Sequence, residues 1–226
     1  MKTILKASGL NQEFRLADGT VFHVLKDINM EIPEGQMTML KGRSGSGKTT
    51  LLNLLGALDY PVSGSILFED KEITGLNSKE RALLRRNNIG FVFQSIALIP
   101  MMNAYENVEY ALRLAEFKEN KKDRVTECLK AVGLAERMMH FPEEMSGGEQ
   151  QRVAIARAVA HRPSVIFADE PTGALDTNTG LQVMKLFREL VEKEHITVVM
   201  TTHDPNIMRL GDRGYELEDG EIIGTW

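Results

Sequence analysis

Four short apolar runs dominate the hydrophobic pattern of the chain. They cover residues 37–40, 89–93, 165–168 and 197–200. Each run is too short for an ordinary helix and shows little alternation with polar residues, which is typical of strands buried on both faces of a parallel sheet. Longer stretches with helical spacing separate the runs. The pattern therefore predicts an α/β fold built on a mostly parallel sheet.

The N-terminal segment has a different pattern. Residues 4–30 mix short apolar stretches with the turn pair Asp18-Gly19. Asp-Gly between apolar stretches is a strong hairpin signal. We therefore expect an N-terminal antiparallel β subdomain beside the parallel sheet.

A block of helical patterns lies between the second and third apolar runs. Helical spacing is present in residues 103–116, 121–132 and 134–139, with Gly133 and Pro142 as breaks. We expect an inserted helical subdomain at about 95–145. The core would then comprise about 1–94 and 146–226, within a single domain that spans 1–226.

Composition narrows the classes of function. The chain has 226 residues, and its 27 Lys and Arg against 32 Asp and Glu give a formal net charge of -5. This charge offers no overall attraction to phosphate backbones, so no nucleic-acid partner is expected. The single cysteine, Cys128, cannot form an intrachain disulfide, which favours a reducing, cytoplasmic compartment. There is no signal-peptide pattern and no apolar run near the roughly 20 residues that span a bilayer, so any membrane role requires another chain as the anchor.

A phosphate-binding pattern follows the first apolar run. Two glycines four residues apart precede a lysine and a hydroxyl, and the next residues, 50–58, have leucines at 51, 52, 54, 55 and 58 that we expect to cover a buried helical face. Successive backbone N–H groups and a helix N-terminus would surround the anion, with the lysine charge on the β and γ phosphates and the Thr49 hydroxyl on magnesium. The expected nucleotide contacts are Gly42, Arg43, Ser44, Gly45, Ser46, Gly47, Lys48, Thr49 and Thr50.

Chemically active side chains also follow the other apolar runs. Asp169 and Glu170 come directly after the run 165–168, at the strand end where open α/β sheets bind their ligands. Asp169 is suited to hold magnesium, and Glu170 to take a proton from the water that attacks the γ phosphate. Gln94 follows its own run and is a second candidate for the metal and the attacking water. His203 lies just past the run 197–200 and could contact the γ phosphate or orient Glu170.

A second candidate anion site is the turn Ser146-Gly147-Gly148, which opens an expected helix over residues 150–160. A dinucleotide-binding loop is a competing interpretation of the first glycine motif, but its third glycine would fall at Thr50. A generic phosphate-loop kinase would leave the Ser-Gly-Gly turn without a function.

Together these motifs resemble the ATP-binding subunit of ABC transporters over nearly the whole chain. The motifs that carry the resemblance are the phosphate loop, Gln94, the segment 145–151, Asp169-Glu170, the segment 173–176 and His203. The resemblance implies a P-loop NTPase core, ATP and Mg²⁺ as ligands, hydrolysis by Lys48, Gln94, Glu170 and His203, and a head-to-tail dimer with a second copy of the chain. In such a dimer, each copy completes its partner's ATP site with Ser146, Gly147, Gly148 and Glu149.

The resemblance also implies roles for residues outside these motifs. Asp176 would lie at the dimer interface, and Phe14 is the best match to the family's adenine-stacking aromatic, although Phe22 is nearby. Two residues depart from the usual pattern: Met145 replaces the leucine before Ser-Gly-Gly, and Glu149 replaces the glutamine after it.

Four segments are similar in sequence to members of the macrolide-exporter, lipoprotein-releasing and FtsE-type branch: 56–64, 89–94, 103–108 and 168–176. That branch implies a separate integral membrane permease, placing this chain in the cytoplasm on the inner face of the cell membrane. Export or extraction of a peptide, drug or lipid-linked cargo is the first functional expectation. The alternative is a regulatory ATPase that transmits force through a membrane partner to periplasmic or cell-wall enzymes without moving cargo.

Overall fold

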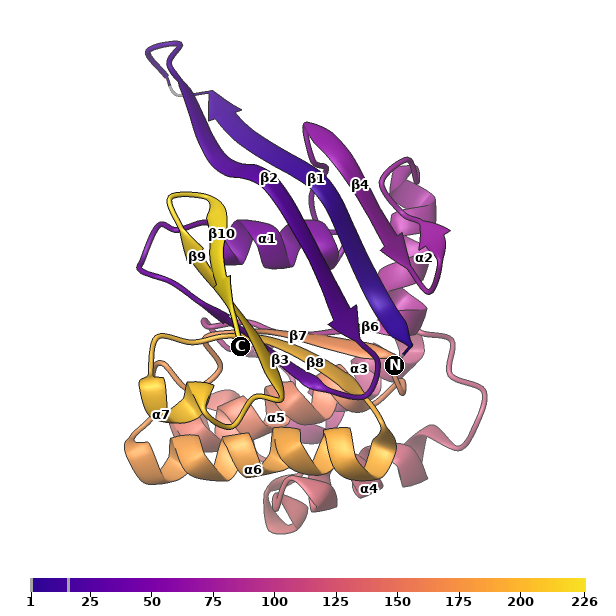
Figure 1. Ribbon diagram of the computed structural model, residues 1–226. Coiled ribbons are helices and arrows are strands. Elements are labelled where there is room, and N and C mark those ends of the chain that lie inside the picture. The colour runs from indigo at the N-terminus through magenta and orange to yellow at the C-terminus, as the bar shows by residue number, and fades with distance from the viewer. Residues whose placement is uncertain (1, 16) are drawn as a thin grey trace.

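The central sheet is mostly parallel. The computed structural model describes residues 2–15 and 17–226, and over these residues the larger sheet has six strands in the order β10-β9-β3-β8-β7-β6 (Figure 1). Its neighbouring strands are parallel except for the pair β9 and β10. The strands are β3 (Met37–Lys41), β6 (Ile89–Val92), β7 (Val165–Asp169), β8 (Thr197–Thr201), β9 (Arg213–Glu218) and β10 (Glu221–Thr225). The prediction of an α/β fold with four buried parallel strands is confirmed.

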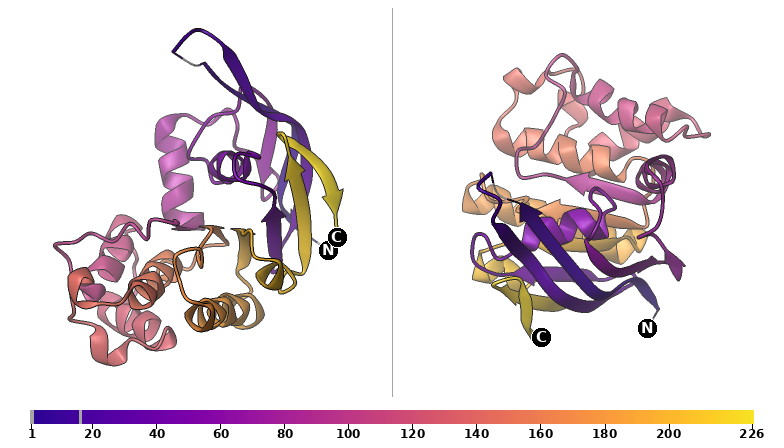
Figure 2. Two further views of the ribbon diagram at one scale, coloured as in Figure 1. Left: turned by 90° about the vertical axis from the view of Figure 1, so that its left-hand side faces the viewer. Right: turned by 90° about the horizontal axis from the view of Figure 1, so that it is seen from above.

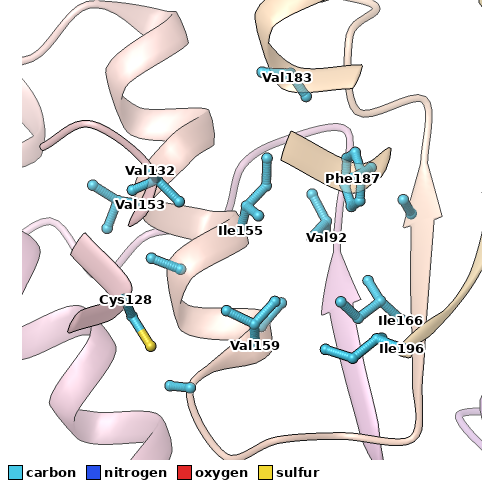
Figure 3. Packing of buried hydrophobic residues seen from close by; sticks show 14 of the residues in the cluster. Val92, Cys128, Val132, Val153, Ile155, Val159, Ile166, Val183, Phe187 and Ile196 are labelled. Atoms are coloured by element: carbon cyan, nitrogen blue, oxygen red, sulfur yellow. The ribbon is translucent and has the colours of Figure 1, made fainter. Parts of the chain in front are cut away.

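The two faces of this sheet enter two separate cores, since successive side chains of a strand point to opposite faces. On β7, Ile166 packs in the core that contains α5 (Gly147–Val159) and α6 (Thr177–Glu194), whereas Phe167 packs in the core that contains α1 (Lys48–Leu55). Figure 3 shows the first core, with Phe187 of α6 near Val92 of β6. Burial on both faces explains why these strands are apolar throughout.

A smaller antiparallel sheet covers α1 on its other side. It has four strands over the described residues, in the order β2-β1-β4-β5. The strands β1 (Thr3–Arg15) and β2 (Val21–Pro33) form the predicted N-terminal hairpin, and β4 (Ser63–Phe68) and β5 (Lys71–Glu72) complete the sheet. In Figure 1 the helix α1 lies between the two sheets. The helix that begins at the phosphate loop is therefore enclosed by buried apolar side chains from both sides.

The segment between β6 and α5 is helical. It contains α3 (Ala104–Leu114), α4 (Lys121–Ala131) and the short 3₁₀ turns η1 (Ala135–Arg137) and η2 (Pro142–Glu144). These elements lie beside α5, away from the β1–β2 hairpin, in both views of Figure 2. None of the helices in the described part of the chain is long and apolar enough to cross a membrane. The division into a core and a helical subdomain near residues 95 and 145 stays a prediction.

Three expectations about local structure need correction. Residues 134–139 contain only the turn η1, because the eight residues between Gly133 and Pro142 are too few for a stable helix. The helix after the phosphate loop is Lys48–Leu55, so it starts two residues earlier and ends three residues earlier than expected. Leu58 lies beyond that helix end and is 41% exposed, so it does not belong to the buried face. The remaining helices are α2 (Ser78–Asn88) and α7 (Pro205–Met208), which follows His203 closely.

Candidate active site

The phosphate loop connects β3 to α1, as its sequence predicted. Gly47 is the N-cap of α1 with φ 100°, a left-handed conformation that favours glycine. A Cβ atom there would lie 2.8 Å from Leu25 Cδ2 and 2.9 Å from the Val24 carbonyl oxygen, both on β2. The hairpin therefore packs directly on the loop backbone, and only glycine fits between them.

Lys48 is held inside the loop. Its Nζ donates to the carbonyl oxygens of Gly42 at 2.8 Å and Arg43 at 2.9 Å, and the side chain is buried. An ammonium group has three N–H donors, so these two bonds leave one for a phosphate oxygen. The loop residues Arg43, Ser44 and Gly45 are exposed, whereas Thr50 is half-buried in the first turn of α1. The loop thus has an open outer rim above a fixed lysine.

Hydroxyl groups contact both oxygens of Asp169, at the end of β7. Thr49 Oγ1 donates to Oδ2 at 2.9 Å, and Thr201 Oγ1 donates to Oδ1 at 2.6 Å. Hydroxyl and carboxylate oxygens are hard donors of the kind that Mg²⁺ prefers. Thr49 and Asp169 lie within hydrogen-bond distance of each other, so their oxygens fit a shared magnesium site beside the phosphate loop.

Glu170 lies one residue further along the chain, and two side chains reach its carboxylate. Gln94 Nε2 lies 3.5 Å from Glu170 Oε2, and His203 Nδ1 lies 3.4 Å from the same oxygen. The three residues follow β6, β7 and β8, adjacent strands whose carboxyl ends meet at one sheet edge. The structure therefore brings together the predicted set Lys48, Thr49, Gln94, Asp169, Glu170 and His203.

The Ser-Gly-Gly turn forms the start of α5, so the helix begins three residues earlier than the expected residue 150. Ser146 is the N-cap: its N–H donates to Glu149 Oε2 at 2.8 Å, and its Oγ accepts from the Glu149 N–H at 3.3 Å. The Ser146 N–H and the Ser146 hydroxyl, at 2.8 Å and 2.9 Å, both donate to Glu149 Oε2 and hold the pKa of that carboxyl below its ordinary range, and Arg137 at 3.4 Å lowers the pKa further. The N–H groups of Gly147 and Gly148 are the first two of the helix and have no intrahelical acceptor. They remain able to bind an anion.

Asp176 is the N-cap of α6 and lies close to this turn. It accepts hydrogen bonds from the N–H groups of Asn178 and Thr179 and from the Thr179 hydroxyl at 2.6 Å, which lower the pKa of its carboxyl. A Cβ atom on Gly148 would overlap the Thr179 methyl group, so glycine allows α5 to approach α6. The helix ends that carry Ser146 and Asp176 are therefore packed together.

A pocket of about 330 Å³ connects Asp176 to the catalytic candidates. Its lining includes Glu170, Asp176 and His203. Phe14 lies apart from this pocket, on β1, where it pairs with Phe22 of β2 in the antiparallel register. The two rings are 45% and 54% exposed, so both are available for stacking and the structure does not choose between them.

Thr201 is the site residue that sequence reasoning missed. It is fully buried, at the last position of β8, and it contacts Asp169 and the backbone of Glu170. The signal was present in the sequence, because a hydroxyl residue closes an otherwise apolar strand at the edge where two carboxylates were expected.

The fold and this site define a class of protein. A glycine-rich loop leads from β3 into the N-terminus of α1, and carboxylates stand at the end of β7 in the same sheet, an arrangement that defines a P-loop nucleoside triphosphatase. The chain also matches the family model described as "ABC transporter" over residues 25–173. It belongs to the ABC transporter family, as an ATP-binding cassette ATPase.

Similar proteins support this assignment over nearly the full chain. The chain is 43% identical over 224 residues to the uncharacterized ABC transporter ATP-binding protein MJ0796 of Methanocaldococcus jannaschii, covering 97% of this chain and 95% of that protein. A structure of MJ0796 described as dimeric, in a post-hydrolysis state with ADP and Pi, superposes with a TM-score of 0.92 at 40% identity, covering 98% of this chain and 97% of the other.

The resemblance to the macrolide-exporter branch is also supported. The macrolide export ATP-binding/permease protein MacB of Hahella chejuensis is 45% identical over 221 residues, which cover 97% of this chain and 34% of MacB. The ABC transporter ATP-binding protein YtrE of Bacillus subtilis is 45% identical over 202 residues, 89% of this chain and 87% of that protein.

Proposed function

We propose that two copies of this chain close head to tail over two Mg-ATP and reopen after hydrolysis. The observation that carries this proposal is a second helix start, at Ser146-Gly147-Gly148, whose first N–H groups have no intrahelical acceptor. Among the described residues, no hydrogen bond or ion pair links Ser146 or Glu149 to Lys48, Asp169 or Glu170. A helix N-terminus with free N–H groups binds anions. The anion at this turn would be a phosphate of the ATP that the phosphate loop of a second copy holds. The dimeric state of MJ0796 agrees with this arrangement.

Within each site we assign roles from the contacts described above. Lys48 and the loop amides bind the β and γ phosphates, and Thr49, Asp169 and Gln94 hold Mg²⁺, which would neutralise charge on the phosphate oxygens. Glu170 accepts the proton of the attacking water, and His203 and Gln94 orient its carboxylate. The partner's site is completed by Ser146, Gly147, Gly148 and Glu149. Asp176 lies at the interface between the two copies. Phe14 stacks on adenine.

We further propose a membrane partner, a permease encoded separately from this chain, which places the ATPase at the cytoplasmic, inner face of the membrane. MacB is described as a combined ATP-binding and permease protein. The segment 96–102 is the proposed contact: Met101 is 86% exposed, and the carbonyl oxygens of Ile96 and Ala97 accept hydrogen bonds from Arg157 of α5 at 3.3 Å and 2.6 Å. The cargo would be a peptide, drug or lipid-linked molecule.

The placement of the permease contact is tested by crosslinking. Met101→Cys introduces an exposed thiol into a chain whose own Cys128 is buried. In membranes from cells that express the full system, we expect a thiol-reactive crosslinker to join residue 101 to an integral membrane protein. Ile223→Cys, at a residue that is also exposed, on β10, is the control and should give no such product. Equal products from both positions would contradict the proposed contact.

The dimer proposal is tested by size-exclusion chromatography of Glu170→Gln with and without Mg-ATP. The substitution removes the proposed base and keeps the shape of the side chain, so ATP should bind without being consumed. We expect a shift from monomer to dimer with Mg-ATP. The double variant Glu170→Gln with Ser146→Arg should bind ATP and stay monomeric, because arginine blocks the turn. A monomer at saturating ATP in the single variant would contradict the head-to-tail arrangement.

A further inference from the structure

Thr201 has surroundings that no other buried threonine of the central sheet shares. Its side chain is fully buried at the last position of β8. Two other fully buried threonines lie on these strands: Thr197 Oγ1 accepts from the Gly35 N–H at 2.9 Å, and Thr38 Oγ1 has no hydrogen-bond partner among the described residues. Of these three hydroxyls, only that of Thr201 contacts the carboxylate end of β7.

The directions of its two hydrogen bonds follow from the chemistry of the groups. The Glu170 N–H is a donor only, so Thr201 Oγ1 accepts from it, at 2.9 Å. The single hydroxyl proton is then free to donate to Asp169 Oδ1 at 2.6 Å. One oxygen atom therefore bonds simultaneously to the carboxylate of Asp169 and to the backbone of Glu170.

The position of Thr201 in the strand register explains why a side chain makes this bond. The pair Asp169 and Thr201 is the last of the parallel ladder between β7 and β8. Glu170 leaves the strand with φ 45°, a left-handed conformation that non-glycine residues adopt only where surrounding contacts impose it. Its N–H has passed the end of the ladder, and the Thr201 hydroxyl supplies the acceptor that the sheet no longer offers.

The Asp169 carboxylate is held from two sides. The torsion that rotates a carboxylate is broad, so a single hydrogen bond leaves its plane poorly defined. Thr201 bonds to Oδ1 and Thr49 bonds to Oδ2, which fixes the plane and leaves Oδ2 beside the phosphate loop.

From this geometry we propose that Thr201 is a positioning residue: its hydroxyl sets the orientation of the metal-binding carboxylate of Asp169 and the backbone of the catalytic Glu170 together. The inference rests on the proposed function, because it takes the roles of Asp169 and Glu170 from there. The Thr201 hydroxyl is buried, and its hydrogen bonds go to Asp169 and to the Glu170 backbone, so its effect passes through these two residues.

The test uses Thr201→Val, which removes the hydroxyl and keeps the shape of the side chain. In the full-length Glu170→Gln background, where ATP is not consumed, Mn²⁺ affinity with ATP bound is measured by electron paramagnetic resonance. Loss of a hydrogen bond to a charged group predicts Mn²⁺ binding weaker by about tenfold. Turnover, measured with Glu170 in place, should fall by a similar factor, and Thr201→Ser should restore both quantities.

Thr38→Val is the matched control. It makes the same change at a fully buried position on the neighbouring strand β3, where the hydroxyl has no hydrogen-bond partner within residues 2–15 and 17–226, so Mn²⁺ affinity should stay at the wild-type value. If Thr201→Val does not fold, Thr201→Ser and Thr201→Ala make the same comparison, since both lack the methyl group and only serine keeps the hydroxyl. Mn²⁺ affinity should then be higher in the serine variant.

Two outcomes overturn the inference: wild-type Mn²⁺ affinity in Thr201→Val, or equal loss in Thr201→Ser and Thr201→Val, which would assign the effect to packing. Asp169→Asn separates this failure from failure of the proposed function. If Asp169→Asn weakens Mn²⁺ binding and Thr201→Val does not, only the role of Thr201 is wrong. If neither variant changes Mn²⁺ binding, the proposed role of Asp169 is wrong as well.

Discussion

The two helix starts that we propose as anion sites, at α1 and at α5, are built in opposite ways. The start of α1 is fixed by hydrogen bonds to other parts of the site: Lys48 is bonded to two loop carbonyls, and Thr49 is bonded to Asp169. The start of α5 is exposed, and its Ser146 contacts its own Glu149 in a capping box. The first site has its charges fixed before a nucleotide arrives. The second has its backbone donors in place, while its nearby cation, Arg137, is already paired with Glu149.

This difference shows how binding and closure can be separated within one chain. A preorganised site pays little ordering entropy on binding, so α1 suits the nucleotide that each copy holds. The turn at α5 offers the first backbone donors of the helix and the positive end of its dipole. In the proposed dimer, this turn binds a phosphate that the second copy presents. In this proposal, the start of α1 determines the affinity for nucleotide, and the start of α5 determines the affinity of one copy for the other.

The largest expected effects come from two separate substitutions, one at the start of each helix. Lys48→Ala should weaken ATP binding by at least about tenfold, because it removes a charge that contacts phosphate in the ground state. Ser146→Arg should leave ATP binding in the monomer unchanged and abolish turnover. Isothermal titration and phosphate release measure the two quantities.

Mixing these two variants sharpens the comparison. A mixed dimer contains one site in which an intact Lys48 faces an intact Ser146, so ATPase activity should reappear on mixing. Absence of activity in the mixture, with both proteins folded, would show that the two helix starts do not meet in the way proposed.

The next effect concerns the packing of α5 on α6. Gly148→Ala should lower the free energy of unfolding by about 1–3 kcal/mol, because the new methyl group overlaps the β-branched side chain of Thr179. Gly147→Ala is the matched control, since a Cβ there meets nothing within 4 Å. Urea denaturation of the two variants gives the comparison. Equal stability would mean that α5 and α6 adjust to each other without cost.

A substitution in the aromatic pair of the hairpin should change ATP affinity by a free energy of similar size, without a change in stability. Phe14→Ala should weaken ATP binding by about tenfold, the size of one base stacking on an aromatic ring, and should have little effect on inorganic triphosphate. Phe22→Ala is the control from the opposite strand. If Phe22→Ala gives the larger loss, then the adenine lies on the β2 side of the hairpin.

The smallest effect is the pH dependence of the cap at α5. The pKa of Glu149 is lowered in the folded chain from an ordinary value of 4.5, so its contribution is fully present above that pH and is lost as the pH falls through the folded value. Glu149→Gln should cost about 0.5–1 kcal/mol at pH 7. The difference from wild type should shrink below pH 4.5, as measured by denaturation at both pH values. A difference that is constant with pH would assign the cost to packing.

The strands and the phosphate loop could be predicted from the sequence because their signals are local. An apolar run such as 165–168 followed by Asp169 indicates both a buried strand and its functional end. Leu58 was misplaced because helical spacing continues past Gly56, where the helix has already ended. The spacing records which residues are apolar and does not record where hydrogen bonding stops.

The rest of the site depends on contacts between distant segments. Thr201 and Asp169 are 32 residues apart, and only the parallel register of β7 and β8 makes them neighbours. The packing of Gly148 against Thr179 likewise joins two helix starts that no local pattern connects. Phe14 and Phe22 are paired by the hairpin register, so the structure explains why sequence spacing could not separate them.

The bond from Arg157 to the segment after Gln94 has a mechanical consequence. Its guanidinium holds the carbonyl oxygens of Ile96 and Ala97, while the same helix carries Ser146 at its other end. An α-helix resists stretching, because every backbone hydrogen bond lies along its axis. A force on the residues after Gln94 would therefore be transmitted through Arg157 along the axis of α5. In the proposed dimer, the segment after Gln94 of one copy would therefore be coupled through α5 to the turn that binds the other copy's phosphate.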